Sequence, residues 1–135
     1  MENLTRIRIM IIDDHPVVRA GLASMLSTQP LIEVVASAAS GLEALAILER
    51  ERFDVMLVDI AMPEHDGYEL IRTVRALPSP ETAHVPAAAL TAFARDEDQK
   101  KSYESGFQLH LTKPIDPALL VEAVATLRAQ NAAAV

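Results

Sequence analysis

The sequence contains no cysteine and no tryptophan, and only 4% of its 135 residues are aromatic. The absence of cysteine excludes a disulfide framework and a thiolate metal site. Cationic residues are the minority: 12 Lys and Arg against 19 Asp and Glu give a formal net charge of −7. We therefore expect no direct nucleic-acid partner and no binding to a membrane surface, because both need clustered cations facing phosphate groups.

Long hydrophobic runs are also missing. The longest nearly apolar stretch, Val85 to Ala94, is far shorter than the ~20 residues that a membrane-spanning helix needs. The N-terminal apolar run is interrupted by two aspartates, and the basic start and small-residue cleavage site of a signal peptide are absent. These features predict a cytoplasmic protein.

Aliphatic residues dominate what is present, since 50% of the residues are hydrophobic. The length suits a single domain over residues 1–135, with a core of about 7–129 and a frayed tail after Gln130. Short apolar runs typical of buried strands alternate with segments of helical spacing. The expected strands are Ile7–Ile12, Ile32–Ala36, Val55–Val58, Ala87–Leu90 and Leu109–Leu111. The expected helices are Pro16–Leu26, Gly41–Arg50, Tyr68–Leu77, Asp96–Ser105 and Pro117–Ala129.

This alternation predicts an α/β fold in which a doubly wound, five-stranded parallel sheet carries helices on both faces. The flavodoxin-like strand order 2-1-3-4-5 is the natural choice for five such units. The proline-rich segment from Pro78 to Pro86 is expected to be a connecting loop rather than a domain boundary.

Acidic residues follow two of the predicted strands. Asp13 and Asp14 come directly after the first strand, and Asp59 ends the third. Ligands in this fold bind beyond the carboxyl ends of the strands where the strand order reverses, which is between strands one and three. Three carboxylates there would raise one another's pKa values unless a cation neutralised them, and hard oxygen ligands favour Mg²⁺. The sequence therefore predicts a magnesium site.

A hydroxyl and an ammonium group should border the same pocket. Thr91 is expected at the end of the fourth strand and Lys113 at the end of the fifth. Phosphoryl transfer needs an aligned nucleophile and positive groups around three equatorial oxygens. Asp59 could act as the nucleophile, with Mg²⁺, Lys113 and Thr91 each serving one phosphoryl oxygen.

Four segments together resemble the receiver domain of bacterial response regulators, the phosphoacceptor domain of two-component signalling. The segments are IMIIDDHP, VMLVDIAMPEHDGYEL, AAALTAFA and GFQLHLTKPID. Each alone is a weak signal, but their order at the strand ends is very specific. The resemblance extends from Ile7 to about Leu127.

The resemblance implies that Asp59 accepts a phosphoryl group from a histidine kinase or a histidine phosphotransfer protein. Direct Mg²⁺ ligands would be Asp14, Asp59 and the backbone carbonyl of Ala61, whereas Asp13 would act through water. A cis peptide bond between Lys113 and Pro114 is also implied.

The expected output is regulatory. The protein would catalyse only its own Mg²⁺-dependent phosphorylation and dephosphorylation, and would then change its contacts with an unknown downstream protein. Self-association as a homodimer is one form that this contact could take.

One position departs from the usual family pattern. His110 stands three residues before Lys113, where the family often has an aromatic residue, and it would pair with Thr91 in the usual switch. A partly buried, hydrogen-bonded histidine is the favoured interpretation over a switch role. The side chains of Ala61 and Phe93 occupy positions that tune phosphate lifetime in relatives.

Two other functions compete with the receiver interpretation. A metal-dependent phosphohydrolase acting through an aspartyl phosphate commonly has a second acid two residues after its nucleophile, and Ala61 stands there. A phosphate-independent binding module would not need the full set of pocket residues. Asp13 or Asp14, taken alone, could merely cap the helix that begins at Pro16.

Overall fold

The computed structural model describes residues 6–62, 66–93 and 95–133, and its strands form one parallel sheet of order β2-β1-β3-β4-β5. The predicted fold class and strand order are therefore confirmed. The strands are β1 (Ile7–Ile12), β2 (Ile32–Ala38), β3 (Val55–Asp59), β4 (Ala87–Thr91) and β5 (Leu109–Thr112). The helices are α1 (Pro16–Leu26), α2 (Gly41–Leu48), α3 (Gly67–Arg75), α4 (Pro80–Ala83), α5 (Asp96–Ser105) and α6 (Pro117–Ala133).

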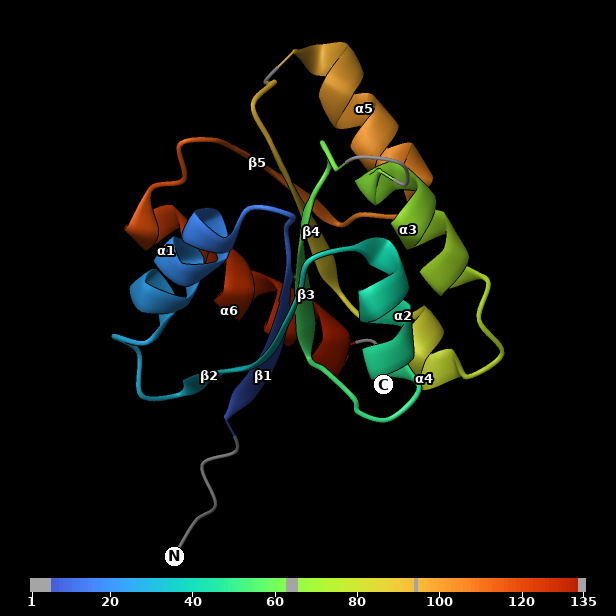
Figure 1. Ribbon diagram of the computed structural model, residues 1–135, viewed down its shortest axis with the longest axis horizontal. Helices are drawn as coiled ribbons and strands as arrows, with labels where there is room; N and C mark the ends of the chain where they lie inside the picture. The colour runs from blue at the N-terminus through green and yellow to red at the C-terminus, as the bar shows by residue number, and fades with distance from the viewer. Residues whose placement is uncertain (1–5, 63–65, 94, 134–135) are drawn as a thin grey trace, which may run out of the picture.

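Helices cover both faces of the sheet, with α1 and α6 on one side and α2 and α3 on the other (Figure 1). Alternate residues of each central strand enter opposite cores, as the two-residue period of a strand requires. Met10, Ile12, Met56 and Val58 pack towards α2 and α3. Ile9, Ile11, Val55 and Leu57 pack towards α1 and α6. Burial on both faces explains why these strands are continuous apolar runs.

Local sequence signals set the helix starts. Pro16 opens α1, where its missing N–H would have no intrahelical partner. The side chain of Ser40 accepts a hydrogen bond from the Glu43 N–H at the start of α2, and that of Asp66 accepts one from the Glu69 N–H at the start of α3. Gly106 ends α5 with a φ of 129°, a conformation that strongly favours glycine.

The expected loop between Pro78 and Pro86 contains a short helix, α4, which the sequence analysis missed. Pro80 occupies its first turn, and the Ala83 N–H donates to the Ser79 carbonyl at 2.8 Å. A single turn is too short to show hydrophobic periodicity, so its pattern could not be distinguished from a loop.

The last helix is longer than expected, since its predicted end was Ala129. Helix α6 continues through Ala133, because alanine is the strongest helix former and no glycine or proline follows Pro117 to stop the helix. The other boundaries agree with expectation or differ from it by one or two residues, which is ordinary for helix and strand ends. Among the residues that the structure describes, no helix is both long enough and apolar enough to cross a membrane.

Candidate functional site

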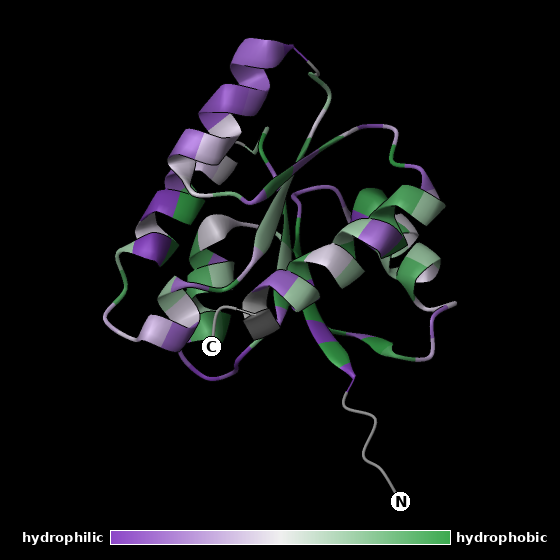
Figure 2. Cartoon of the chain, turned by 180° about the vertical axis from the view of Figure 1, so that it is seen from behind, coloured by the Kyte–Doolittle hydropathy of each residue, from purple (hydrophilic) through white to green (hydrophobic). Residues whose placement is uncertain are grey.

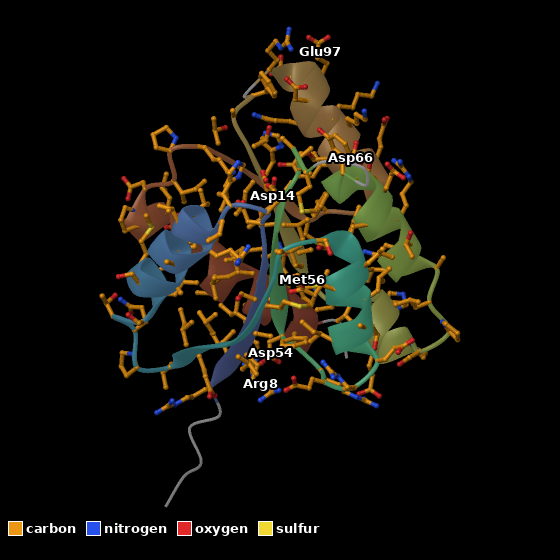
Figure 3. The ribbon with its side chains drawn as sticks, viewed as in Figure 1. Arg8, Asp14, Asp54, Met56, Asp66 and Glu97 are labelled. Atoms are coloured by element: carbon orange, nitrogen blue, oxygen red, sulfur yellow. The ribbon has the colours of Figure 1, made fainter. Side chains whose placement is uncertain are left out.

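The predicted site residues gather at the carboxyl edge of the sheet. β1 and β3 are neighbours with Ile12 opposite Val58, which brings Asp13 next to Asp59. Thr91 is the last residue of β4, as expected, whereas Lys113 lies one residue beyond the end of β5. Figure 3 shows Asp14 at this end of the sheet, far from Arg8 and Asp54 at the other end.

Three carboxylates and one imidazole crowd this edge. One potential ligand atom from each of Asp13, Asp14, His15 and Asp59 lies within 4.8 Å of the others. The side chains of Asp13 and Asp59 are almost completely buried. Buried like charges at this spacing repel strongly, so the arrangement calls for a cation.

The ammonium group of Lys113 supplies part of the missing positive charge. Its Nζ lies 3.0 Å from Asp59 Oδ1 and 3.3 Å from Asp13 Oδ2. Burial alone would lower the pKa of Lys113, but the hydrogen bond to Asp59 and the charges of Asp59 and Asp13 outweigh it and raise that pKa. Lys113 is therefore held in its charged form.

The positive charge of Lys113 does not balance the negative charge of the three carboxylates. Burial raises the pKa of Asp59, and the Asp13 charge adds to the rise, although hydrogen bonds from Lys113 and from the backbone of Ala61 oppose it. Asp59 Oδ2 and Asp14 Oδ1 are buried without a hydrogen-bond partner among the described residues. Buried carboxylate oxygens that accept no hydrogen bond are unusual, and they suit a hard divalent cation that takes oxygen ligands.

Close packing after the acidic strand shapes the neighbouring loop. A Cβ on Gly67 would lie 2.8 Å from the carbonyl oxygen of Asp59 and 3.0 Å from Cα of Ile60. The Gly67 N–H donates to the Ile60 carbonyl at 3.0 Å. Glycine thus lets the start of α3 lie directly against the end of β3. Pro63 to His65, between these points, lie outside the described residues.

Thr91 ends β4 and is almost completely buried, and its carbonyl accepts a hydrogen bond from the Lys113 N–H at 2.7 Å. Its Oγ1 accepts a hydrogen bond from the Phe93 N–H at 3.1 Å. His110, on the adjacent strand, is partly buried and hydrogen-bonded as expected: its ring nitrogens lie 2.9 Å from Ser102 Oγ and 3.0 Å from the Phe93 carbonyl oxygen. The peptide bond between Lys113 and Pro114 is cis.

His15 and Arg19 support the acidic cluster, although no role was expected for either from the sequence. The His15 N–H donates to Asp13 Oδ1 at 2.8 Å, and its Nδ1 lies 3.1 Å from Asp14 Oδ1. Arg19 Nη1 donates to the Asp13 carbonyl at 2.6 Å. The only signal for His15 was its position directly after the two aspartates, and Arg19 is brought near by the first turn of α1.

The sequence matches the response regulator receiver domain family over residues 9–125. The chain belongs to the receiver domain family. Two solved receiver structures agree in fold. A two-component response regulator of the LuxR family from Aurantimonas sp. SI85-9A1 superposes with a TM-score of 0.85 at 30% identity, covering 93% of this chain and 87% of that one. The receiver domain of sensor histidine kinase PA1611 from Pseudomonas aeruginosa has a TM-score of 0.80 at 30% identity, with 93% and 99% covered.

The PA1611 receiver is described with a magnesium ion coordinated in its active-site cleft. Among curated relatives, an uncharacterized 14.6 kDa protein of Leptolyngbya boryana is 47% identical over 124 residues, covering 92% of each chain. The uncharacterized transcriptional regulatory protein YhcZ of Bacillus subtilis is 38% identical over 116 residues, but the receiver matches only 52% of its length. The chain thus spans nearly all of one relative and about half of the other.

Receivers are regulatory domains of two-component phosphorelays, and this chain has their fold and the acidic edge that goes with it.

Proposed function

We propose that Asp59 of this receiver accepts a phosphoryl group from a phosphohistidine of a histidine kinase or phosphotransfer protein. One observation carries the proposal: Lys113 Nζ holds Asp59 Oδ1 at 3.0 Å, while Oδ2 of the same carboxylate is buried without a hydrogen-bond partner in the described chain. Lys113 thereby orients the carboxylate and leaves one oxygen free to attack. Asp13 Oδ1 is already occupied by the His15 N–H.

The transfer balances as a simple displacement. Oδ2 of Asp59 forms a bond to phosphorus, and the bond from phosphorus to the donor's histidine nitrogen breaks, with its electron pair staying on that nitrogen. Lys113 neutralises charge on the transferred group, and the Thr91 hydroxyl donates to one of its oxygens after leaving the Phe93 N–H.

The proposed cofactor is Mg²⁺, held by Asp13, Asp14 and Asp59 and by the backbone carbonyl of Ala61, with Asp13 acting through water. When bound, the ion supplies positive charge to the phosphoryl oxygens and to the crowded carboxylates. Oδ1 of Asp14, which is buried without a hydrogen bond, and the oxygen-rich cluster support this assignment.

The proposed activity is self-modification rather than turnover of phosphate esters. Ala61 stands where a phosphohydrolase commonly has its second acid, so no described carboxylate is placed there to activate water. Phosphorylation would change contacts with a downstream protein or with a second copy of the chain, in the cytoplasm.

The test is incubation with Mg²⁺ and a small acyl phosphate, followed by intact-mass measurement. We expect one phosphoryl group on the wild type and none on Asp59→Asn. Asp96→Asn, on the exposed first turn of α5, is the matched control and should label like the wild type. Equal labelling of Asp59→Asn, or steady hydrolysis of a generic phosphomonoester, would overturn the proposal.

A further inference from the structure

A continuous hydrogen-bonded chain connects the candidate phosphoryl site with helix α5. It begins at Thr91 Oγ1, which accepts from the Phe93 N–H at 3.1 Å. The Phe93 carbonyl lies 3.0 Å from Nε2 of His110, whose Nδ1 lies 2.9 Å from Ser102 Oγ. Ser102 Oγ donates to the Asp98 carbonyl at 3.1 Å. Four consecutive contacts therefore tie the end of β4 and its following loop to β5 and α5.

The four hydrogen-bonded contacts can all form only when His110 is protonated, because of the number of hydrogens that they need. A carbonyl only accepts, so Nε2 must carry a hydrogen to bond with Phe93. In neutral imidazole Nδ1 then has none, and the Ser102 hydroxyl would have to donate both to Nδ1 and to the Asp98 carbonyl. A hydroxyl has one hydrogen and can satisfy only one of them.

Protonated imidazole removes this conflict. Nδ1–H then donates to Ser102 Oγ, whose own hydrogen is free for the Asp98 carbonyl, so each of the three contacts has one donor and one acceptor. The side chain of Ser102 is fully buried, so solvent cannot easily replace a lost bond. The ring of His110 is only partly buried, so protons can reach it.

The surroundings allow the protonated ring. Leu109 and Leu111 enter the core beside α6, which leaves His110 on the α5 side of the sheet. Its register partner on β4 is the uncharged Ala89. Charged groups on the packed loop and on α5 are Arg95, Asp96, Glu97, Asp98, Lys100, Lys101 and Glu104. Arg95 is already close to the Asp98 carboxylate at 3.3 Å, and α5 is hydrophilic along its length (Figure 2).

We propose that His110 is a proton-dependent latch that, when protonated, fastens the loop after β4 to Ser102 of α5. This regulation rests on the proposed function, because the latch opposes the movement of Thr91 towards a phosphoryl group. Once Thr91 Oγ1 leaves the Phe93 N–H, the Phe93 carbonyl can shift only if its bond to His110 yields. Acidic conditions therefore hold the resting arrangement, and neutral to alkaline conditions release α5 to respond.

The expected size of the effect follows from one hydrogen bond. A typical net hydrogen bond corresponds to a roughly fivefold change in an equilibrium constant. The ratio of switched to resting molecules under a phosphoryl mimic should thus be about fivefold higher above the histidine titration range than below it.

The experiment records backbone amide shifts of the full chain with Mg²⁺ and beryllofluoride at about pH 6 and about pH 8, on either side of the usual histidine range. Residues flanking Asp59 should shift at both pH values, which reports occupancy of the site. Residues of α5 should shift more at the higher pH, in line with the roughly fivefold change in the ratio of switched to resting molecules. Equal α5 shifts at both pH values, with the Asp59 signals present, would overturn the latch but leave the proposed function intact.

Three variants assign the effect. His110→Phe and Ser102→Ala should each make the α5 response independent of pH, because they remove the imidazole or its buried hydrogen-bond acceptor. His84→Gln is the control and should keep the wild-type pH dependence, since the exposed His84 ring hydrogen-bonds to the Pro80 carbonyl at 2.9 Å and is not part of the chain of hydrogen bonds through His110. A pH dependence that survives in His110→Phe contradicts the proposal.

A titration without beryllofluoride tests the latch even if Asp59 does not bind the mimic. The amide signals of Phe93 and Ser102 should then move together with the ring signals of His110 in the wild type. Independent titration of the ring, with Phe93 and Ser102 unaffected, would discard the latch. Absence of any beryllofluoride response near Asp59 would instead count against the proposed function.

Discussion

The two ends of the sheet arrange their charged side chains in opposite ways. At the carboxyl end, Lys113 contacts Asp13 and Asp59, and two buried carboxylate oxygens of the acidic cluster make no hydrogen bond with the described residues. At the amino end, Arg8 donates to the Glu51 carboxylate and to the Arg52 carbonyl, its N–H donates to Asp54, and its guanidinium lies over the ring of Phe53. Figure 3 shows Arg8 and Asp54 at this end.

Arg75 completes the contrast. Its guanidinium donates to the carbonyls of Gly106 and Ala83 and to the side chain of Gln108, and burial lowers its pKa to about 10. These described partners are neutral oxygens, so the group works by hydrogen bonding rather than ion pairing. The amino end is thus satisfied by its own protein groups, which is what stability favours. The carboxyl end is left incomplete, which is what ligand binding requires.

The largest expected effect is the loss of stability when Arg75, at the amino end of the sheet, is replaced. Arg75→Met keeps the aliphatic stem but leaves the Gly106 and Ala83 carbonyls without this donor, so we expect a loss of about 2–3 kcal/mol in the free energy of unfolding. Urea unfolding measures it. Arg72 lies three residues earlier on the same helix and donates to Ser105 Oγ at 3.3 Å. Arg72→Met is therefore the control, and its free energy of unfolding should fall much less.

Phosphoryl labelling of folded Arg75→Met should match that of the wild type, because the substitution lies at the opposite end of the sheet. If labelling fell while the protein remained folded, the two ends would not be independent and the comparison would break down.

A smaller effect is expected at the acidic end. Asp14→Ala removes a carboxylate whose Oδ1 is buried without a hydrogen bond, so Mg²⁺ affinity should fall at least about tenfold, a lower bound taken from the loss of groups that only support metal ligands. A Mg²⁺ titration followed by amide shifts measures it. Asp116→Ala, which removes only the cap on the Ala118 N–H, should leave the affinity unchanged. Unaltered binding by Asp14→Ala would place the ion elsewhere.

The smallest effect concerns pH and stability without metal. Burial raises the pKa of Asp59 in the folded state, so the native protein holds this proton more tightly than the unfolded chain does. The corresponding stability is present at low pH and is lost as pH rises through the folded-state pKa. The side-chain amide of Asp59→Asn does not ionise, so the variant does not lose this stability. Its free energy of unfolding should therefore rise relative to that of the wild type as pH rises from about 4 towards neutrality.

Urea unfolding of both proteins in the presence of a chelator gives this difference at each pH. A constant difference across the range would show that Asp59 is not destabilised by burial. Added Mg²⁺ should reduce the advantage of the variant, since the ion stabilises only the chain that binds it.

Much of this receiver could be predicted from its sequence because the signals were local. The apolar runs ending in Asp13 and Asp59 indicated buried parallel strands, and the alternation with helical spacing led to the strand order. Parallel strands place their carboxyl ends at one edge, so Thr91 and Lys113 could be assigned to the same pocket from order alone. The single turn of α4 and the extension of α6 to Ala133 escaped because neither has a periodic or stop signal of its own.

The tertiary structure decided the contacts between groups that are distant along the chain. Two features depend on the positions and burial of β1, β3 and β5: Lys113 contacts both Asp59 and Asp13, and two acidic oxygens accept no hydrogen bond from the described residues. The hydrogen-bonded chain from Thr91 through His110 to Ser102 likewise depends on where α5 packs. The sequence determined which chemical groups end each strand, because strand and helix periodicity is local. Packing decided the distances, the burial and the pairing of hydrogen-bond donors with acceptors. These properties belong to pairs of residues that come together only in the folded state.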